Sequence, residues 1–149
     1  MRLTRRRTCA ESSLLTTLFL AALGCAARAP RVGVGPTCVV GDTALVRETL
    51  YFGRNRPGGG TVDDAEWRTF LNQVLTRRFP AGLTVVNATG QWKGESGVVE
   101  QEQSNVVTIY HAGDAASNQA VREVALEYKQ RFGQEAVLRE RIPTCAAFE

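Results

Sequence analysis

Apolar residues recur at helical spacing in two segments of the chain. In the first segment they follow the i, i+3, i+4 spacing of one helix face, at Trp67, Phe70, Leu71, Val74 and Leu75. Asp63 precedes this stripe, and Glu66 three residues later completes a capping-box pattern. Pro80 ends the segment because it has no backbone N–H to continue the helical hydrogen bonds. The pattern predicts a helix that begins after Asp63 and ends before Pro80.

The second helical segment follows Asp114, a favoured residue at helix N-caps. Its apolar stripe comprises Val121, Val124, Ala125, Tyr128 and Phe132. Gly133 lies just past the stripe, where the left-handed conformation that often closes a helix favours glycine. Glu127 and Arg131 are four residues apart, and we expect them to pair on the outer face of this helix.

Four further segments predict strands, because they combine β-branched and aromatic residues with an alternating pattern. They are residues 49–52, 83–88, 105–111 and 136–142. In the first, Leu50 and Phe52 share one face while Tyr51 lies on the other. In the third, Val107 and Ile109 share a face in the same way.

The segments between these elements are rich in glycine. Residues 53–60 contain three consecutive glycines, Gly58–Gly60, and predict a loop. Residues 90–97 predict the turn of a hairpin, although Trp92 lies inside this turn.

The resulting order, β-α-β-β-α-β, is that of the ferredoxin-like α+β folds. In such a two-layer sandwich, two helices cover one face of a four-stranded antiparallel sheet. We expect the helix-covered face to carry Leu50, Phe52, Leu138 and Ile142. We expect the open face to carry Tyr51, Val137, Arg139 and Arg141. An open face of this kind favours contact with a ligand or with a second copy in a homodimer.

The N-terminal segment determines the expected location of the protein. Arg5–Arg7 precede an uncharged run of 13 residues, Ser12–Gly24, and Cys25 follows directly. A membrane-spanning helix needs about 20 apolar residues, so the run is too short to span a bilayer stably. Residues 1–24 therefore predict a signal peptide that ends at a lipoprotein-type cleavage site.

Three outcomes of this segment remain open. In the favoured one, Cys25 is acylated and holds the protein to the cell envelope, facing the periplasm. Residues 25–37 are then the lipidated N-terminus and a flexible tether, and residues 38–149 form a single domain. Ordinary cleavage near Gly24 or Ala27 gives a secreted soluble protein instead, and the third outcome is an uncleaved N-terminal anchor.

Removal of residues 1–24 changes the charge of the chain. The full sequence has 18 Lys+Arg and 15 Asp+Glu residues, with a pI of about 8.9. Four arginines and one glutamate lie in the signal segment, which leaves 14 basic and 14 acidic residues. A neutral domain lacks the positive charge that neutralises phosphates, so we do not expect nucleic-acid binding.

Two of the four cysteines lie in the N-terminal segment and two lie in the domain. Cys9 leaves with the signal and Cys25 is the expected lipidation site, so Cys38 and Cys145 remain in the domain. In an oxidising compartment two such thiols favour a disulfide. The predicted fold also places the chain before the first strand beside the chain after the last, which is where Cys38 and Cys145 lie. With one histidine, His111, the sequence predicts no metal site, and no pattern predicts a cofactor.

Several short motifs resemble a bacterial family of short, often secreted proteins that is classed as a domain of unknown function. These motifs are Tyr51-Phe52-Gly53-Arg54, Trp67 with Phe70, Arg78-Phe79-Pro80, Gly82-Leu83-Thr84-Val85, Gly90-Gln91-Trp92, and Tyr128-Lys129 with Phe132. The resemblance covers residues 49–138 and supports the single-domain prediction. It implies no particular activity.

The candidate chemistry is sparse. Gly58–Gly60, which follow Arg54 and Arg56, are typical of a flexible loop, and the alternative is an anion-binding loop that uses these two arginines. His111 is an ordinary strand-end histidine or a weak catalytic candidate, since no nucleophile-elbow motif accompanies it. Trp92 beside glycines is a candidate to line a cleft.

Two functions follow. The first is a non-catalytic binding or accessory module of the cell envelope, whose ligand or protein partner the sequence does not identify. Its candidate ligand-binding residues are Tyr51, Arg54, Arg56 and Trp92. The second is a small-molecule enzyme of the dimeric α/β-barrel type. Its cleft would lie near Tyr51, Arg54, Trp92 and His111.

Overall fold

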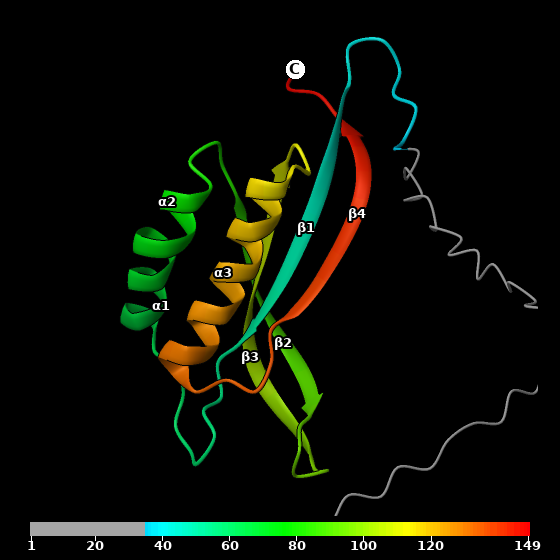
Figure 1. The fold of residues 1–149 in the computed structure, drawn as a ribbon. Coiled ribbons are helices and arrows are strands. Elements are labelled where there is room, and N and C mark those ends of the chain that lie inside the picture. The colour runs from blue at the N-terminus through cyan, green and yellow to red at the C-terminus, as the bar shows by residue number, and fades with distance from the viewer. Residues whose placement is uncertain (1–34) are drawn as a thin grey trace, which may run out of the picture. The chain divides into compact units, whose positions relative to one another are not determined.

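The computed structural model describes residues 35–149, so the predicted signal peptide, the cleavage site and Cys25 lie outside the described residues. Four strands form one antiparallel sheet in the order β2-β3-β1-β4. The strands are β1 (Thr43–Gly53), β2 (Thr84–Lys93), β3 (Val99–His111) and β4 (Leu138–Ala146). Figure 1 shows the helices packed against one face of this sheet. The ferredoxin-like α+β prediction is therefore confirmed.

The first helical region is continuous, but the type of helix changes along its length. It begins as α1 (Asp64–Phe70), passes through a π-helical segment, η1 (Leu71–Leu75), and ends as α2 (Thr76–Arg78). Asp63 caps it as predicted, because its carboxylate accepts hydrogen bonds from the backbone N–H groups of Ala65 and Glu66.

The second helix, α3 (Ala115–Phe132), is also capped as predicted. Asp114 accepts a hydrogen bond from the N–H of Ser117 at its start, and Gly133 adopts a φ of 69° at its end. The predicted pair on its outer face is wrong. Glu127 instead lies 2.9 Å from Arg78 of α2, so this carboxylate links the two helical regions.

The core lies between the helices and the covered sheet face. Both predicted apolar stripes contribute to it, and the sheet adds Leu50, Phe52, Val107 and Ile109. Aromatic rings form its centre, with Tyr128 in edge-on contact with Phe52 and Phe70 at centroid distances of 4.8 and 5.0 Å. The Tyr128 hydroxyl donates a hydrogen bond of 2.9 Å to the carbonyl of Gly53, which fixes the end of β1.

The prediction of which residues of the last strand face the helices is wrong, because the alternation is shifted by one residue. Arg139 pairs with Leu50 and Leu138 with Tyr51, so the arginine lies on the covered face and the leucine on the open face. Ile142 and Arg141 are exchanged in the same way, because Ile142 pairs with Arg47 and Arg141 with Glu48. Val137, which we expected on the open face, packs against the core. The arginines are on the covered face because they contact the buried carboxylate of Glu48.

The strands of the hairpin are longer than predicted. Strand β2 continues to Lys93 and β3 begins at Val99, so the turn is shorter than residues 90–97. Trp92 is therefore a strand residue that pairs with Glu100, which explains a large aromatic side chain at this position.

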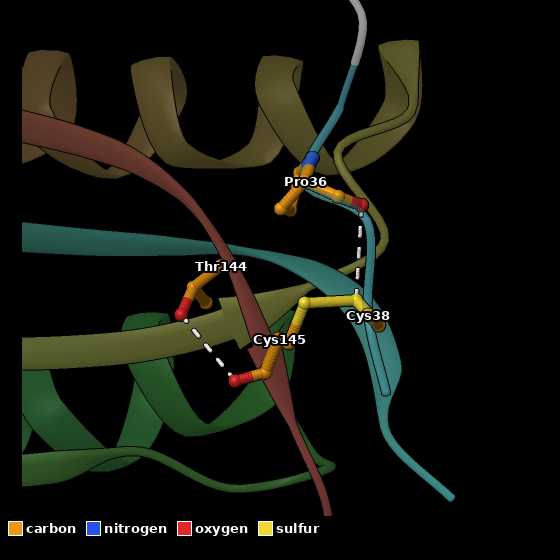
Figure 2. Close-up of a disulfide and its surroundings, with 4 residues drawn as sticks. All are labelled: Pro36, Cys38, Thr144 and Cys145. Atoms are coloured by element: carbon orange, nitrogen blue, oxygen red, sulfur yellow. Dashed lines mark hydrogen bonds between the residues drawn. A yellow bond between two sulfur atoms is a disulfide. The ribbon is translucent and has the colours of Figure 1, made fainter. Parts of the chain in front are cut away.

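Cys38 and Cys145 form the predicted disulfide, with their Cα atoms 5.5 Å apart. Figure 2 shows that Cys38 belongs to the segment before β1, beside Cys145 near the end of β4. Since β1 and β4 are antiparallel neighbours, the fold itself brings the two thiols together. Within residues 35–149, none of the helices has the length and apolar character needed to cross a bilayer.

Candidate functional site

A pocket of about 590 Å³ lies at the end of the sheet where β1 finishes. Three connections gather there, at the lower end of the view in Figure 1: the loop before α1, the β2–β3 turn and the α3–β4 connection. The strands contribute Tyr51, Gly53, Gly90, Gln91, Trp92, Glu100, Glu102, Ser104 and Leu138. The connections contribute residues 55–61, Gly94 and residues 134–136.

The floor of the pocket is the open face of the sheet. On this face, Tyr51 pairs with Leu138 toward the β4 edge of the sheet, and Trp92 pairs with Glu100 toward the β2 edge. Glu102 belongs to β3, which lies between β2 and β1. Its carboxylate accepts a hydrogen bond of 3.3 Å from the backbone N–H of Asn55. Aromatic and carboxylate groups therefore lie next to each other on the same surface.

Gly53 makes room for the Glu102 carboxylate. A Cβ atom at position 53 would collide with both carboxylate oxygens of Glu102. Glycine at this position, which belongs to the Tyr-Phe-Gly-Arg motif, therefore lets the Glu102 carboxylate lie directly against the backbone of β1 at the floor of the pocket.

The glycine-rich loop forms one wall. Gly58, Gly59 and Gly60 have φ angles of 83°, 106° and 86°, a region that side chains with a Cβ rarely adopt. The loop closes on itself, because the N–H of Arg56 donates to the carbonyl of Gly60 at 3.0 Å. Three consecutive glycines are therefore required by the shape of this wall.

Hydrogen bonds connect the walls to one another. The Gln134 side chain donates to the carbonyl of Asn55 at 2.6 Å, and the Asn55 side chain donates to the carbonyl of Gln101 at 3.1 Å. Glu135 accepts a hydrogen bond of 3.2 Å from the N–H of Glu95 in the β2–β3 turn. The three connections therefore form one linked frame around the pocket.

The pocket lining is acidic. Three carboxylates belong to it, those of Glu100, Glu102 and Glu135, against a single cation, Arg56. The guanidinium group of Arg56 is already paired, since it donates at 2.7 Å to each carboxylate oxygen of Glu66 and lies 5.6 Å from the centre of the Phe132 ring. The lining therefore favours a neutral or positively charged group over an anion.

The ion pair of Arg56 is maintained at neutral pH. A hydrogen bond from the backbone N–H of Asp63, together with the Arg56 guanidinium, holds the pKa of Glu66 below its ordinary value. Glu66 is therefore ionised, and Arg56 is not available to compensate the other carboxylates of the pocket.

The structure brings together three of the four predicted ligand-binding residues. Tyr51, Arg56 and Trp92 all line the pocket. Arg54 does not, because its guanidinium group donates to the carbonyl of Val62 at 2.7 Å and lies 2.8 Å from Asp64. Its side chain attaches the glycine-rich loop to the start of α1.

His111 lies far from this pocket and on the other face of the sheet. It follows Ser104 by seven residues of β3, which corresponds to about 23 Å of extended strand. Its Nδ1 accepts a hydrogen bond of 2.9 Å from the N–H of Gly113, so the proton of the neutral ring is on Nε2. That nitrogen lies 3.5 Å from a carboxylate oxygen of Glu48.

Glu48 is the centre of a buried charged cluster that the sequence analysis did not predict. Its side chain is fully buried and receives two hydrogen bonds from Arg139, while Arg141 lies 3.7 Å away. Burial alone raises the pKa of Glu48, but the hydrogen bond and charge of Arg139, then Arg141 and His111, hold it below its ordinary value. The alternation of Glu48 with Leu50 and Phe52 was the signal that could have placed it on the covered face.

The acidic residues of the pocket were also missed. Glu100 and Glu102 lie in the part of β3 that precedes Asn105, where the sequence pattern predicted the strand to begin. Without the extended strand, these carboxylates had no assigned face. In the part of the chain from residue 35 onward, no three His, Cys, Asp or Glu side chains group as metal ligands would.

The fold and the pocket define a small, disulfide-bonded α+β domain with an open sheet face. The family model described as "Protein of unknown function (DUF3574)" matches residues 47–148. The chain belongs to this family, which agrees with the resemblance found in the motifs. No curated protein matches the sequence.

Two solved structures are similar to this chain at low sequence identity. A phage SAM lyase in complex with S-methyl-5'-thioadenosine is similar with a TM-score of 0.55 and 14% identity, over 76% of this chain and 95% of that chain. CutA from Synechococcus elongatus is similar with a TM-score of 0.47 and 7% identity, over 71% of this chain and 83% of that chain. At these identities the likeness concerns the fold alone.

Proposed function

We propose that this protein is a non-catalytic binding module of the bacterial cell envelope, held to the membrane by a lipid on Cys25. The observation that carries the proposal is the pocket of about 590 Å³ at the open sheet face. Pockets that bind small molecules have volumes of roughly 300–1,000 Å³, combining aromatic surface with a few polar groups. Tyr51 and Trp92 supply the aromatic surface here, and the carboxylates supply the polar groups.

The ligand we propose is a small organic molecule with a positively charged or neutral polar end. Glu100, Glu102 and Glu135 attract a cation, and the indole face of Trp92 adds a cation–π contribution of roughly 0.5–2 kcal/mol. Trp92 is 45% exposed, so its ring is available to a ligand.

A binding role is favoured over catalysis because the residues of the enzyme hypothesis do not converge. Tyr51 and Trp92 line the pocket, whereas Arg54 is engaged with Asp64 and His111 with Glu48. A general base must lie within hydrogen-bond reach of its substrate. The buried side chain of His111 lies on the other face of the sheet from this pocket.

Three molecules of matched size test the charge preference: benzylamine, benzyl alcohol and benzoate. We expect the thermal midpoint of the protein to rise most with benzylamine and least with benzoate. The fold likeness to the phage SAM lyase adds S-methyl-5'-thioadenosine, its ligand, as a larger neutral probe. Thermal-shift titration of the full-length chain measures all four.

The control variants distinguish the pocket from the rest of the surface. Trp92→Ala should abolish the shift, whereas Val98→Ala, at an exposed residue of the nearby turn, should leave it unchanged. Equal shifts with benzylamine and benzoate, or a benzylamine shift that survives Trp92→Ala, would contradict the proposed site.

The anchor is tested separately. Cells that express the protein should incorporate radiolabelled palmitate into it, and Cys25→Ser should abolish the label. Label that persists in the Cys25→Ser variant would contradict acylation at this residue, and an unlabelled, secreted wild-type protein would favour ordinary signal cleavage.

A further inference from the structure

One row of apolar side chains crosses the whole open face of the sheet. Tyr51 of β1 pairs with Val106 of β3 on one side and with Leu138 of β4 on the other, and Val106 pairs with Val86 of β2. Their chain neighbours Leu50, Val107, Val137 and Val85 all belong to or pack against the core, so the row itself points away from it. Val86 and Leu138 are 55% and 59% exposed.

On β1 and β3, the charged groups on the two sides of this row have opposite signs. Tyr110 lies four residues after Val106 on β3 and pairs with Arg47. Glu102 lies four residues before Val106 on the same strand. Within the described part of the chain, no carboxylate lies within ion-pair distance of Arg47, and its buried Nε has no hydrogen-bond partner.

We propose that a second copy of this chain packs on the open face, with a two-fold axis along the apolar row. The axis lies between the two sheets, parallel to the row and perpendicular to the strands. Each member of the row then faces its own counterpart, which is the self-complementary contact that two-fold dimers require. Tyr51 faces Tyr51, and Val106 faces Val106.

The same axis brings opposite charges together. It exchanges the two directions along the strands, so the level of Arg47 and Tyr110 faces the level of Glu102 in the second copy. Tyr110 and Glu102 are on the same strand, and Arg47 is one strand away, about 4.8 Å. An arginine side chain spans that offset, so each dimer contains two Arg47–Glu102 pairs and two hydroxyl contacts from Tyr110.

The contact also closes the binding pocket. Tyr51, Leu138 and Glu102 belong both to the pocket lining and to the face that the second copy covers. The second copy therefore forms a roof over a pocket whose floor is the sheet. Because Glu102 pairs with Arg47 in the dimer, Glu100 and Glu135 are the carboxylates that attract a ligand cation there. The dimer itself rests on the face alone and does not depend on the identity of the ligand.

We expect the dimer to be reversible, because the row supplies only four apolar side chains per copy. Sedimentation velocity of the purified full-length chain, in a density-matched detergent, should show a monomer–dimer equilibrium between about 1 and 500 μM. A monomer throughout this range would overturn the proposal.

A pair of variants with matched exposure locates the interface. Val86→Arg places a charge at the row, where it faces the same charge of the second copy. Leu126→Arg places the same charge on α3 at a residue that is 54% exposed, against 55% for Val86. Val86→Arg should weaken dimerisation at least tenfold, and Leu126→Arg should not change it. Equal effects, or no effect of Val86→Arg, would overturn the proposed face.

A charge exchange tests the orientation of the two copies. Arg47→Glu alone and Glu102→Arg alone each place like charges opposite one another and should weaken the dimer. A mixture of the two variants restores both attractive pairs, so it should form a heterodimer at least tenfold more stable than either homodimer. Recovery in the mixture also shows that both variants are folded. A mixture that remains monomeric while wild type dimerises would overturn the two-fold arrangement.

Discussion

Replacement of Glu48 by glutamine perturbs the buried charged cluster with the least change of shape. The substitution removes the negative charge that Arg139, Arg141 and His111 surround. Loss of one partner from a buried ion pair costs about 3–5 kcal/mol when the other charge stays buried. The Arg139 side chain is 25% exposed, so water can solvate part of it. We therefore expect the free energy of unfolding to fall by about 2 kcal/mol.

The effect should depend on pH in a defined direction. The pKa of Glu48 lies below its ordinary value of 4.5 in the folded protein. A lowered folded-state pKa contributes stability that is fully present above the unfolded pKa and is lost as the pH falls through the folded pKa. The stability difference between wild type and Glu48→Gln should therefore be constant from pH 7 to about 5, and should shrink as the pH falls further.

Urea denaturation followed by circular dichroism measures both effects. With a urea dependence of about 2 kcal/mol per M, the midpoint of Glu48→Gln should be lower by about 1 M at pH 7. Glu123→Gln is the control, because Glu123 is half-exposed and lies 3.9 Å from Arg78, so we expect a change below about 0.5 kcal/mol. A Glu48→Gln midpoint within experimental error of wild type, or a difference that grows as the pH falls, would refute this reasoning.

Three further changes test the fold by the same urea assay. Replacement of Cys38 and Cys145 by alanine removes a cross-link between residues 107 apart, and the loop-entropy model predicts a loss of about 4–5 kcal/mol. A reductant should destabilise wild type similarly and leave the variant unchanged. Leu138→Ala should lower the free energy of unfolding by less than about 0.5 kcal/mol, because Leu138 is exposed. Leu50→Ala should lower it by about 2–5 kcal/mol, because Leu50 is buried. Equal losses would contradict the observed face of β4. Asp63→Ala should cost about 1 kcal/mol through loss of the helix cap, and an unchanged midpoint would contradict the capping role.

The elements of the fold were predictable because each has a strong local signal. The apolar stripe with the Asp63 cap defined the first helical region, and Gly133 marked the end of α3 at the correct residue. The disulfide followed from topology, since the ferredoxin-like order makes the first and last strands neighbours. These predictions rest on short-range chemistry or on connectivity, both of which the sequence contains.

The face of β4 was not predictable from its own residues. Leu138 and Ile142 are large apolar residues in phase with each other, and alternation alone assigned them to the core. The structure reverses the assignment because Glu48 on the neighbouring strand is buried and attracts Arg139 and Arg141 to the covered face. A buried charge therefore determined the register of an edge strand, and this requires knowledge of which residues meet.

The pocket was only partly predictable for a similar reason. Trp92 was identified because a large aromatic residue beside glycines is unusual, and Arg56 because it precedes the glycine-rich loop as a candidate anion-binding group. The carboxylates of Glu100 and Glu102 were missed because the polar part of β3 carries no strand pattern. Hydrogen-bonded pairing with β2 holds this part of β3 as a strand, although its own sequence does not predict one.

The proposed binding site is tested most directly by an NMR titration of the ¹⁵N-labelled protein with benzylamine. The account predicts saturable shifts of the Trp92 indole N–H and of the backbone N–H groups of Gly58–Gly60 and Gly90. It predicts no change at His111 or Gly113, which lie at the opposite end of β3 from the pocket. Benzoate at the same concentrations should leave the pocket signals in place. Shifts confined to His111 and Gly113, or equal pocket shifts with both compounds, would contradict the account.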